Sequence, residues 1–297
     1  MMKVKFWGVR GSIPSPGKHT ARYGGNTSCI ELYGEDGTLV IFDAGTGIRS
    51  LGDHLLTLPP SDIHLFLTHT HWDHIHGFPF FRPAYRQNLP LNIYGPYNSE
   101  KTIRETLTLQ MIYSVFPVHV DELEAEIVFH NINEDLIKVG NLSIKPRKMN
   151  HPITCFGYKV EENGKYIFYT GDHEQFFEFR NTEGGTKLAQ KYEGTVKEER
   201  AEGEVDFVKG VDLLIADSQY LEEEYVEKAG YGHSTVSQTL DLAIKAQVKH
   251  LVLFHHEPVR SDDALDNILE MVKQKAIQEG SPDMKITIAE EGIEINV

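Results

Sequence analysis

Short runs of apolar residues along the chain end abruptly in a histidine or an aspartate. Five such runs lie at residues 39–42, 64–68, 165–171, 212–216 and 250–254. They are rich in β-branched and aromatic residues and do not alternate with polar ones, which is typical of strands buried on both faces. The polar residues that follow them are Asp43, His69, Asp172, Asp217 and the pair His255–His256. Because buried strands end along a common rim where loops carry function, these side chains are predicted to converge on one site.

Helical periodicity occurs between these runs. Residues 234–247 and 261–276 place apolar side chains on one face, and Thr235 with Gln238 has the spacing of a capping box. Residues 99–112 form a third candidate helix. Residues 285–297 alternate around a Glu-Gly turn and are predicted to form a β-hairpin. The pattern as a whole predicts a mixed α/β protein.

No short repeat and no linker divides the chain, so residues 1–297 are predicted to form a single domain. Residues 181–204 are polar, charged and poor in apolar periodicity. This composition favours an exposed insertion over a substrate lid.

The composition restricts the compartment and the partners. The 297 residues carry a formal net charge of −15, which argues against a broad nucleic-acid-binding surface. The cysteines, Cys29 and Cys155, form no CxxC pair, so a reducing compartment is expected in place of a disulfide framework. Since the chain has neither an apolar run of about 20 residues nor a signal peptide, it is predicted to be cytoplasmic and not to cross a membrane.

Residues 68–77, THTHWDHIHG, contain four histidines and an aspartate. Buried imidazoles without partners are costly, whereas neutral imidazoles and a carboxylate are typical metal ligands. His69 and His71 are two residues apart, so in an extended loop both can face one ion. Asp73 and His74 follow in a segment that can turn toward a second ion. The cluster therefore predicts two metal ions.

Two ions need a bridge and further ligands from elsewhere in the chain. Asp172 is the best candidate for a bridging carboxylate, and His151 and His255 can complete the two shells. His255 and His256 are adjacent, and only one of them can face a site at the end of a strand.

These residues, taken in order, resemble the motif set of the metallo-β-lactamase superfamily. The motif residues are Asp43, His69, His71, Asp73, His74, His151, Asp172 and His255. GHST at 232–235, preceded by Asp217, resembles the ribonuclease Z and cyclic-phosphate phosphodiesterase branch, where the upstream acid is usually glutamate. The resemblance implies a four-layer αββα sandwich, with two mixed sheets between outer helices and the metal site at one edge. It also favours His255 over His256 as the ligand.

The resemblance implies a role for each of the remaining residues. The expected cofactors are two divalent transition metal ions, with Zn²⁺ as first candidate and Mn²⁺ or Fe²⁺ as alternatives. They would share a hydroxide that attacks phosphorus. His233 is the candidate proton donor to the leaving group, Asp217 orients it, and Asp73 is placed with them among the catalytic residues. The residues expected behind the ligands or near the substrate are Asp43, His256 and Asn26. The glycine-containing segments 10–12 and 24–26 are interpreted as tight turns, with phosphate-binding amides as the alternative.

Together these features predict a dinuclear metal-dependent hydrolase. The leading hypothesis is a phosphodiesterase that cleaves a small cyclic or dialkyl phosphodiester of the cyclic-nucleotide type. The alternatives are ribonuclease Z-like RNA processing, hydrolysis of a lactone, ester or thioester, and a metal or redox sensor without turnover. The predicted partner is a small phosphodiester, not a membrane or an extensive nucleic-acid surface, and a homodimer is compatible with the sequence.

Overall fold

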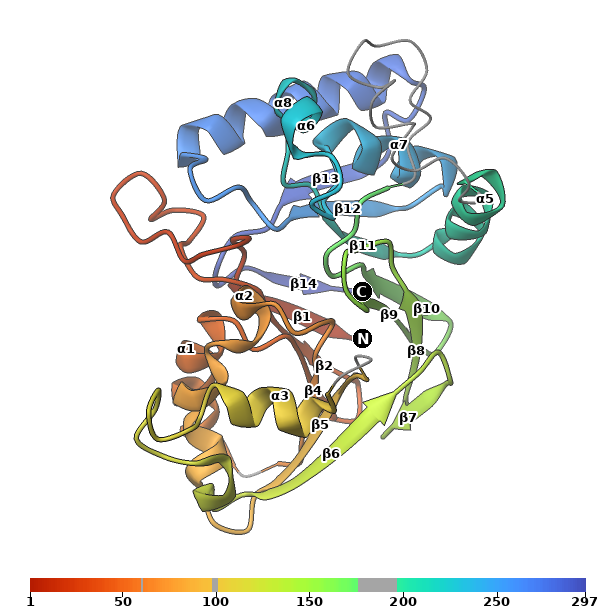
Figure 1. The fold of residues 1–297 in the computed structure, drawn as a ribbon. Helices are drawn as coiled ribbons and strands as arrows, with labels where there is room; N and C mark the ends of the chain where they lie inside the picture. The colour runs from red at the N-terminus through yellow and green to blue at the C-terminus, as the bar shows by residue number, and fades with distance from the viewer. Residues whose placement is uncertain (60, 98–100, 176–196) are drawn as a thin grey trace.

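Two seven-stranded β-sheets pack face to face at the centre of the molecule in the computed structural model (Figure 1), which describes residues 1–59, 61–97, 101–175 and 197–297. The strands of the first sheet, in spatial order, are β14 (Glu294–Asn296), β1 (Lys3–Gly8), β2 (Cys29–Tyr33), β3 (Leu39–Phe42), β4 (Ile63–Phe66), β5 (Pro90–Pro96) and β6 (Glu126–Ile132). The strands of the second are β13 (Lys285–Ile288), β12 (His250–Phe254), β11 (Leu213–Asp217), β10 (Lys165–Tyr169), β9 (Phe156–Glu162), β8 (Leu142–Lys148) and β7 (Ile137–Val139).

Both sheets are mixed. In the first, β3 to β6 run parallel, and β14, β1, β2 and β3 are paired antiparallel. In the second, β10 to β13 run parallel, and β7 to β10 are paired antiparallel. One apolar cluster lies between the sheets, where Phe42 of β3 stacks on Tyr158 of β9 with ring centroids 5.4 Å apart.

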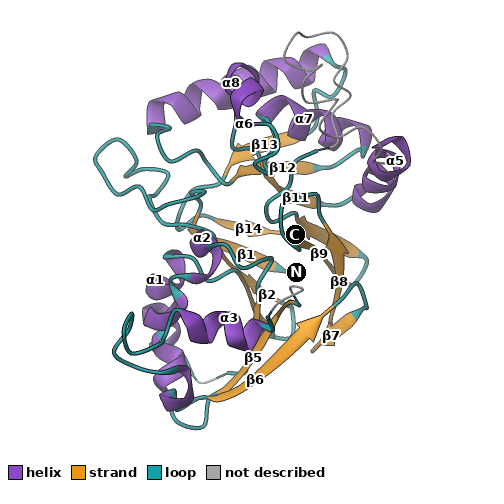
Figure 2. Cartoon of the chain, in the orientation of Figure 1, coloured by secondary structure: helices purple, strands orange, loops and turns teal. Residues whose placement is uncertain are grey.

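Helices cover the two outer faces, as Figure 2 shows by colour. The helices are α1 (Gly47–Leu55), α2 (Trp72–Ile75), α3 (Ile103–Leu109), α5 (Lys197–Val208), α6 (Glu222–Lys228), α7 (Val236–Lys245) and α8 (Asp262–Gln278), with short 3₁₀ turns at Phe78–Phe80, Arg82–Tyr85 and Val120–Glu122. Apolar residues of α1 and α3 pack on the first sheet, and those of α7 and α8 pack on the second. The order is helices, sheet, sheet, helices, so the predicted αββα sandwich is confirmed.

The five apolar runs form β3, β4, β10, β11 and β12, with ends within two residues of those predicted. All residues of β3, β11 and β12 are buried, because each strand has a sheet on one face and helices on the other. The chain turns sharply after two of these strands: Asp43 and His255 have φ values of 61° and 63°, in the left-handed region. This conformation is uncommon in non-glycine residues, and strain of this kind often clusters at functional sites.

Two of the three helix predictions are confirmed. Thr235 caps α7 in the predicted capping box with Gln238, and Ser261 caps α8. The third helix is shorter than the pattern indicated. It begins after Thr102, whose side chain and that of Glu105 form a second capping box, and it ends at Leu109. A local cap therefore sets its start, not the first polar residue of the pattern.

The predicted C-terminal hairpin is wrong. β13 pairs with β12 in the second sheet, and β14 pairs with β1 in the first. The chain passes from one sheet to the other between these strands. There the backbone N–H groups of Glu291 and Gly292 donate hydrogen bonds to the carbonyls of Tyr23 and Phe6. Alternation identified two strands correctly, but it contains no information about the strand with which each one pairs.

Most of the predicted insertion at 181–204 lies outside the described residues. Its last eight residues, 197–204, begin α5, and Glu204 is buried with one carboxylate oxygen 2.6 Å from His173 Nε2. Among the described residues, no helix is long and apolar enough to cross a lipid bilayer.

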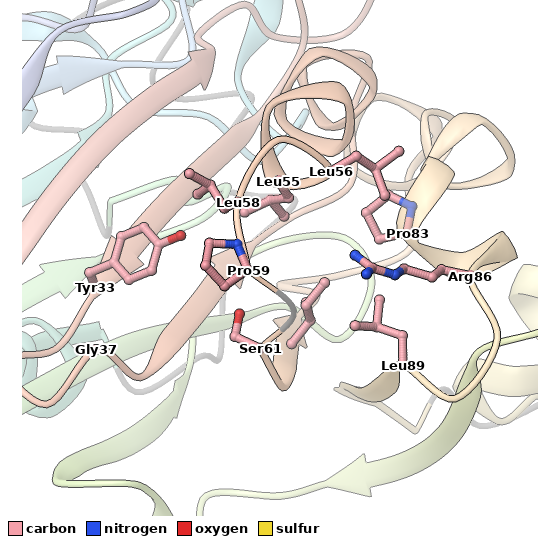
Figure 3. Close-up of a pocket in the computed structure, with 11 residues that line it drawn as sticks. Tyr33, Gly37, Leu55, Leu56, Leu58, Pro59, Ser61, Pro83, Arg86 and Leu89 are labelled. Carbon is pink, nitrogen blue, oxygen red and sulfur yellow. The ribbon is translucent and has the colours of Figure 1, made fainter.

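A pocket of about 280 Å³ lies beside the end of α1 and the start of β4 (Figure 3). Its walls are mainly apolar, with Tyr33, Ser61 and Arg86 as polar members. The predicted site residues follow the other end of β4, and none of them lines this pocket.

Candidate metal centre

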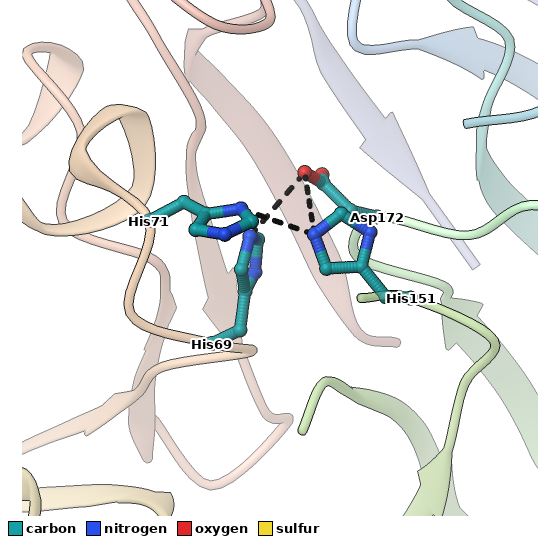
Figure 4. Close-up of side chains that lie close together, drawn as sticks. All are labelled: His69, His71, His151 and Asp172. Atoms are coloured by element: carbon teal, nitrogen blue, oxygen red, sulfur yellow. Dashed lines mark hydrogen bonds and ion pairs between the residues drawn. The ribbon is translucent and has the colours of Figure 1, made fainter. Parts of the chain in front are cut away.

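Four predicted ligands meet at the edge of the two sheets. His69 and His71 follow β4, His151 precedes β9, and Asp172 follows β10. One nitrogen or oxygen from each lies within 4.8 Å of the others (Figure 4). His71 Nδ1 is 3.0 Å from His151 Nε2, and His69 Nε2 is 3.4 Å from Asp172 Oδ2. Three imidazoles and a carboxylate thus converge on one point.

A second group shares Asp172 with the first. Asp73, His74, Asp172 and His255 are all buried, and their ligand atoms also lie within 4.8 Å of one another. Asp172 Oδ1 is 3.0 Å from His74 Nε2 and 3.2 Å from His255 Nε2, so its other oxygen faces His69. Asp172 therefore has the position of a bridging carboxylate.

These residues fit a pair of transition metal ions. His69 Nε2 and Asp172 Oδ1 are buried and have no hydrogen-bond partner among the described residues. Buried polar atoms are normally satisfied, and one cation in each group would satisfy these two atoms. The donors are nitrogen and oxygen atoms. Cys155 Sγ instead donates a hydrogen bond to the Asp172 carbonyl at 3.3 Å, and it lies 3.8 Å from the His69 Nδ1 atom, on the side opposite Nε2.

Protonation in the cluster follows from burial and charge. The pKa of His151 is lowered to about 2 and that of His71 to about 4, mainly because burial disfavours the imidazolium. Burial raises the pKa of Asp172, but the surrounding histidines outweigh it and the pKa falls well below its usual range. His71 and His151 are therefore neutral and Asp172 is ionised, whereas the carboxylates around His74 outweigh its burial and raise its pKa well above the usual range.

A second layer of groups orients three of the histidines. The Asp43 carboxylate lies 2.9 Å from His74 Nδ1, the Gly232 carbonyl 3.0 Å from His151 Nδ1, and the Gln219 amide oxygen 3.1 Å from His255 Nδ1. Each contact fixes the ring so that Nε2 faces the cluster. Asp43 is held in turn by Thr68 and by the Tyr169 hydroxyl at 2.7 Å.

Gln219 was absent from the sequence-based predictions, and Gly232 stood in the GHST motif without a role of its own. Gln219 stands two residues after Asp217, so the two side chains leave the end of β11 on the same side. This spacing of two residues was the signal by which Gln219 could have been predicted. Gly232 acts through its carbonyl, which no residue-type pattern reveals.

A histidine–aspartate pair adjoins the shared carboxylate. His233 Nδ1 lies 2.8 Å from Asp217 Oδ2 and 3.9 Å from Asp172 Oδ2, and its ring stacks on His255 at 4.9 Å. Burial lowers the pKa of His233, but the carboxylates of Asp217 and Asp172 outweigh this and raise it to about 9. Cations near Asp172 would lower it again. The Asp217 contact leaves Nε2 free to face a substrate.

One buried carboxylate holds the turn that carries His233. Glu174 accepts hydrogen bonds from the backbone N–H groups of Gly230 at 2.7 Å and Gly232 at 3.1 Å, and from the Tyr225 hydroxyl at 2.6 Å. The same turn supplies the carbonyl that orients His151. Glu174 therefore connects the candidate ligand His151 with the His233 pair.

Two predicted residues lie away from the cluster. His256 turns the other way from His255, with Nε2 2.9 Å from the Ala289 carbonyl, and burial lowers its pKa to about 3. Asn26 donates from its side chain and backbone to Glu291. His256 points away from the cluster because successive side chains at the end of a strand point to opposite sides. For Asn26, the glycine-rich turn in the sequence did not indicate which way the side chain points.

The amides of the segment at 10–12 are occupied by protein groups. Gly11 N–H donates to the His256 carbonyl at 3.0 Å, and Ser12 N–H donates to Asp73 Oδ2 at 2.7 Å. The alternative of phosphate-binding amides is therefore wrong for Gly11 and Ser12. Instead, this segment contacts Asp73 through Oδ2, the oxygen that also lies 3.2 Å from His255 Nε2.

Comparisons with known proteins agree with this geometry. Residues 38–190 match the family model described as the β-lactamase superfamily domain. The ribonuclease Z of Oceanobacillus iheyensis is 23% identical over 302 residues, covering 92% of this chain and 95% of that protein. The metallo-β-lactamase fold protein YhfI from Bacillus subtilis superposes with a TM-score of 0.67 at 18% identity, covering 100% of both chains. Unliganded yeast PDE1 superposes with a TM-score of 0.66 at 18% identity, covering 100% of this chain and 99% of that one.

The family match spans more than half of the chain and includes the segment that supplies His69 to Asp172. The fold of two mixed sheets between helices is shared with YhfI and PDE1. The protein belongs to the β-lactamase superfamily.

Proposed function

We propose that the protein is a dinuclear metal-dependent phosphodiesterase that acts on a small phosphodiester. The observation that carries the proposal is the position of Asp172, which belongs to both ligand groups and lies 3.9 Å from the His233–Asp217 pair. An ester with a good leaving group can be hydrolysed by the metal ions alone, because that group departs without a proton. A diester with an alkoxide leaving group also needs a proton, and this pair can supply it.

The candidate ligands form two sets, one for each ion. His69, His71 and His151 would hold one, Asp73, His74 and His255 the other, and Asp172 both. When bound there, a pair of divalent cations supplies Lewis acidity and lowers the pKa of water toward neutrality. Zn²⁺ suits these nitrogen and oxygen donors, as do Mn²⁺ and Fe²⁺.

His233 donates the proton that the leaving oxygen needs. Asp217 accepts from His233 Nδ1, fixes the tautomer and favours the imidazolium, so Nε2 carries the proton to be transferred. Asp217 is itself held, because its Oδ2 accepts from the His173 backbone N–H and its Oδ1 from that of Gln219. Asp217 is thus a rigid acceptor, and the dyad does not depend on the longer glutamate.

A small substrate agrees with the charge of the chain. A protein that binds a polynucleotide through many phosphates gains affinity from clustered cations, and this chain has a net charge of −15. The likeness to yeast PDE1 and to ribonuclease Z supports chemistry at phosphorus.

A metal-defined hydrolase screen tests the proposal. Protein purified without chelator should contain about two transition metal ions per chain by elemental analysis. It should hydrolyse bis-p-nitrophenyl phosphate, and cyclic nucleotides faster than lactones or thioesters. Iron without any hydrolysis would instead favour a sensor, and a metal content near zero under replete conditions would refute the metal centre.

Ribonuclease Z-like RNA processing is the second candidate, since the ribonuclease Z relative aligns with 92% of this chain. Cleavage of a precursor tRNA at rates above those for small diesters would favour it. No cleavage of the precursor, with turnover of small diesters, would support the first proposal.

A further inference from the structure

Tyr220 contacts the His233 ring, and Lys228 lies near the rings of both Tyr220 and Tyr231. The Tyr220 ring meets the His233 ring edge-on, with centroids 5.8 Å apart. Lys228 Nζ lies 5.9 Å from the Tyr220 ring centroid and 5.7 Å from that of Tyr231. Tyr231 precedes His233 by two residues and is 59% exposed, whereas Tyr220 is 4% exposed. The Tyr231 ring is therefore open to solvent, two residues from the candidate proton donor.

Lys228 is the cation of this group, and its charge is not neutralised by a neighbouring carboxylate. No carboxylate of the described residues lies within 4.0 Å of its ammonium group, although the helix α6 that carries it contains four glutamates. Glu224 is engaged by Arg260 at 2.6 Å. The other three are exposed to solvent, where their charge is screened. Lys228 is half-buried, which strengthens its attraction for an anion relative to a fully exposed lysine.

The position relative to His233 identifies which part of a substrate reaches this group. Hydroxide attacks phosphorus, the bond from phosphorus to the leaving oxygen breaks, and its electron pair stays on that oxygen. His233 Nε2 gives the proton to this oxygen. The substituent on the leaving oxygen must therefore lie next to His233, whose ring is contacted by Tyr220.

We propose that Lys228 and Tyr231, backed by Tyr220, form a leaving-group subsite that selects an aromatic group with its own negative charge, as in a nucleotide. Tyr231 offers its exposed ring for stacking, and Lys228 offers its ammonium group to the anion. An uncharged aliphatic alcohol would use neither contact. This inference rests on the proposed phosphodiesterase function and adds the class of leaving group.

Non-hydrolysable analogues separate binding in this subsite from turnover. Methyl benzylphosphonate carries a methylene in place of the leaving oxygen, and methyl (4-carboxybenzyl)phosphonate adds one negative charge to the same ring. Their dissociation constants are measured by titration calorimetry on the metal-loaded protein. The wild type should bind the carboxylated analogue about five-fold more tightly, as expected for a partly exposed ion pair.

Matched variants assign the effect to each side chain. Lys228→Gln should abolish the preference for the charged analogue, Lys228→Arg should keep it, and the exposed Lys245→Gln on α7 should leave it unchanged. Tyr231→Ala should bind both analogues roughly ten-fold more weakly because stacking is lost. Tyr231→Phe should bind them with the affinity of the wild type.

Two outcomes overturn the subsite while the phosphodiesterase function stands. One is equal binding of both analogues by a wild-type protein that hydrolyses bis-p-nitrophenyl phosphate. The other is an unchanged preference in Lys228→Gln. A protein with neither bound metal nor hydrolysis would overturn the function itself, so the two failures are distinguishable.

Discussion

Gly11 is not a candidate ligand, yet the substitution Gly11→Ala should disable the second ligand group. A Cβ atom at Gly11 would lie 2.4 Å from both Cε1 and Nδ1 of His255, whereas ordinary contacts of a Cβ are 3.4–4 Å. The ring or the loop must therefore move by about 1 Å. The loop is fixed by the hydrogen bonds from Gly11 to His256 and from Ser12 to Asp73, so the His255 ring is the part that yields.

The expected loss is large because His255 Nε2 lies only 3.2 Å from Asp172 and from Asp73. Misplacing a ligand by about 1 Å should lower turnover roughly 100-fold, with one ion bound 10–100-fold more weakly. Metal titration and turnover of bis-p-nitrophenyl phosphate measure both effects.

Gly17→Ala in the same loop is the matched control, because its Cβ would meet only Thr20 Oγ1 at 3.8 Å. The control should match the wild type in metal affinity and in melting temperature. If Gly11→Ala keeps two tightly bound ions and full turnover, the packing argument for His255 is wrong.

Three further substitutions test the rest of the site. His233→Ala should keep both ions but lose about 10² to 10⁴ in rate on diesters with poor leaving groups and far less on p-nitrophenyl esters, and equal losses on both would exclude proton donation. Asp172→Ala should lose at least one ion by elemental analysis together with most turnover, because Asp172 belongs to both ligand groups; two retained ions would show that another residue is the bridge. Glu174→Ala leaves the N–H groups of Gly230 and Gly232 unpaired, so thermal unfolding should reveal a loss of about 1–3 kcal/mol, and an unchanged melting temperature would count against Glu174 as the support of this turn.

The layers of the fold could be predicted because burial is recorded in the sequence. Runs such as 250–254 contain no polar residue that could face solvent except at their first position, His250. The pairing of strands is not recorded in the same way. Residues 285–297 alternate as a hairpin does, yet β13 and β14 belong to different sheets, because contacts with distant strands decide the partner.

The convergence of the candidate ligands could be predicted for a similar reason, since histidine and aspartate after buried strands have few other uses. The groups behind them could not. Gln219 and Glu174 act through hydrogen bonds to His255 and to the turn at Gly230–Gly232, and such bonds depend on a geometry that only the folded chain creates. The predicted place of Asn26 near the substrate was wrong for the same reason. Its hydrogen-bond partner is Glu291, which is 265 residues away in the sequence.

The ligands of the second group come from both sheets, and this determines when metal can act during folding. His74 and His255 are 181 residues apart in the sequence, and they meet only after the two sheets have docked. Contacts between such distant segments form late, since loop closure must precede them. Metal ions should therefore leave the folding rate nearly unchanged and act chiefly by slowing unfolding, as interactions absent from the transition state do. The two ions would make the folded chain long-lived, and they would not guide it to its fold.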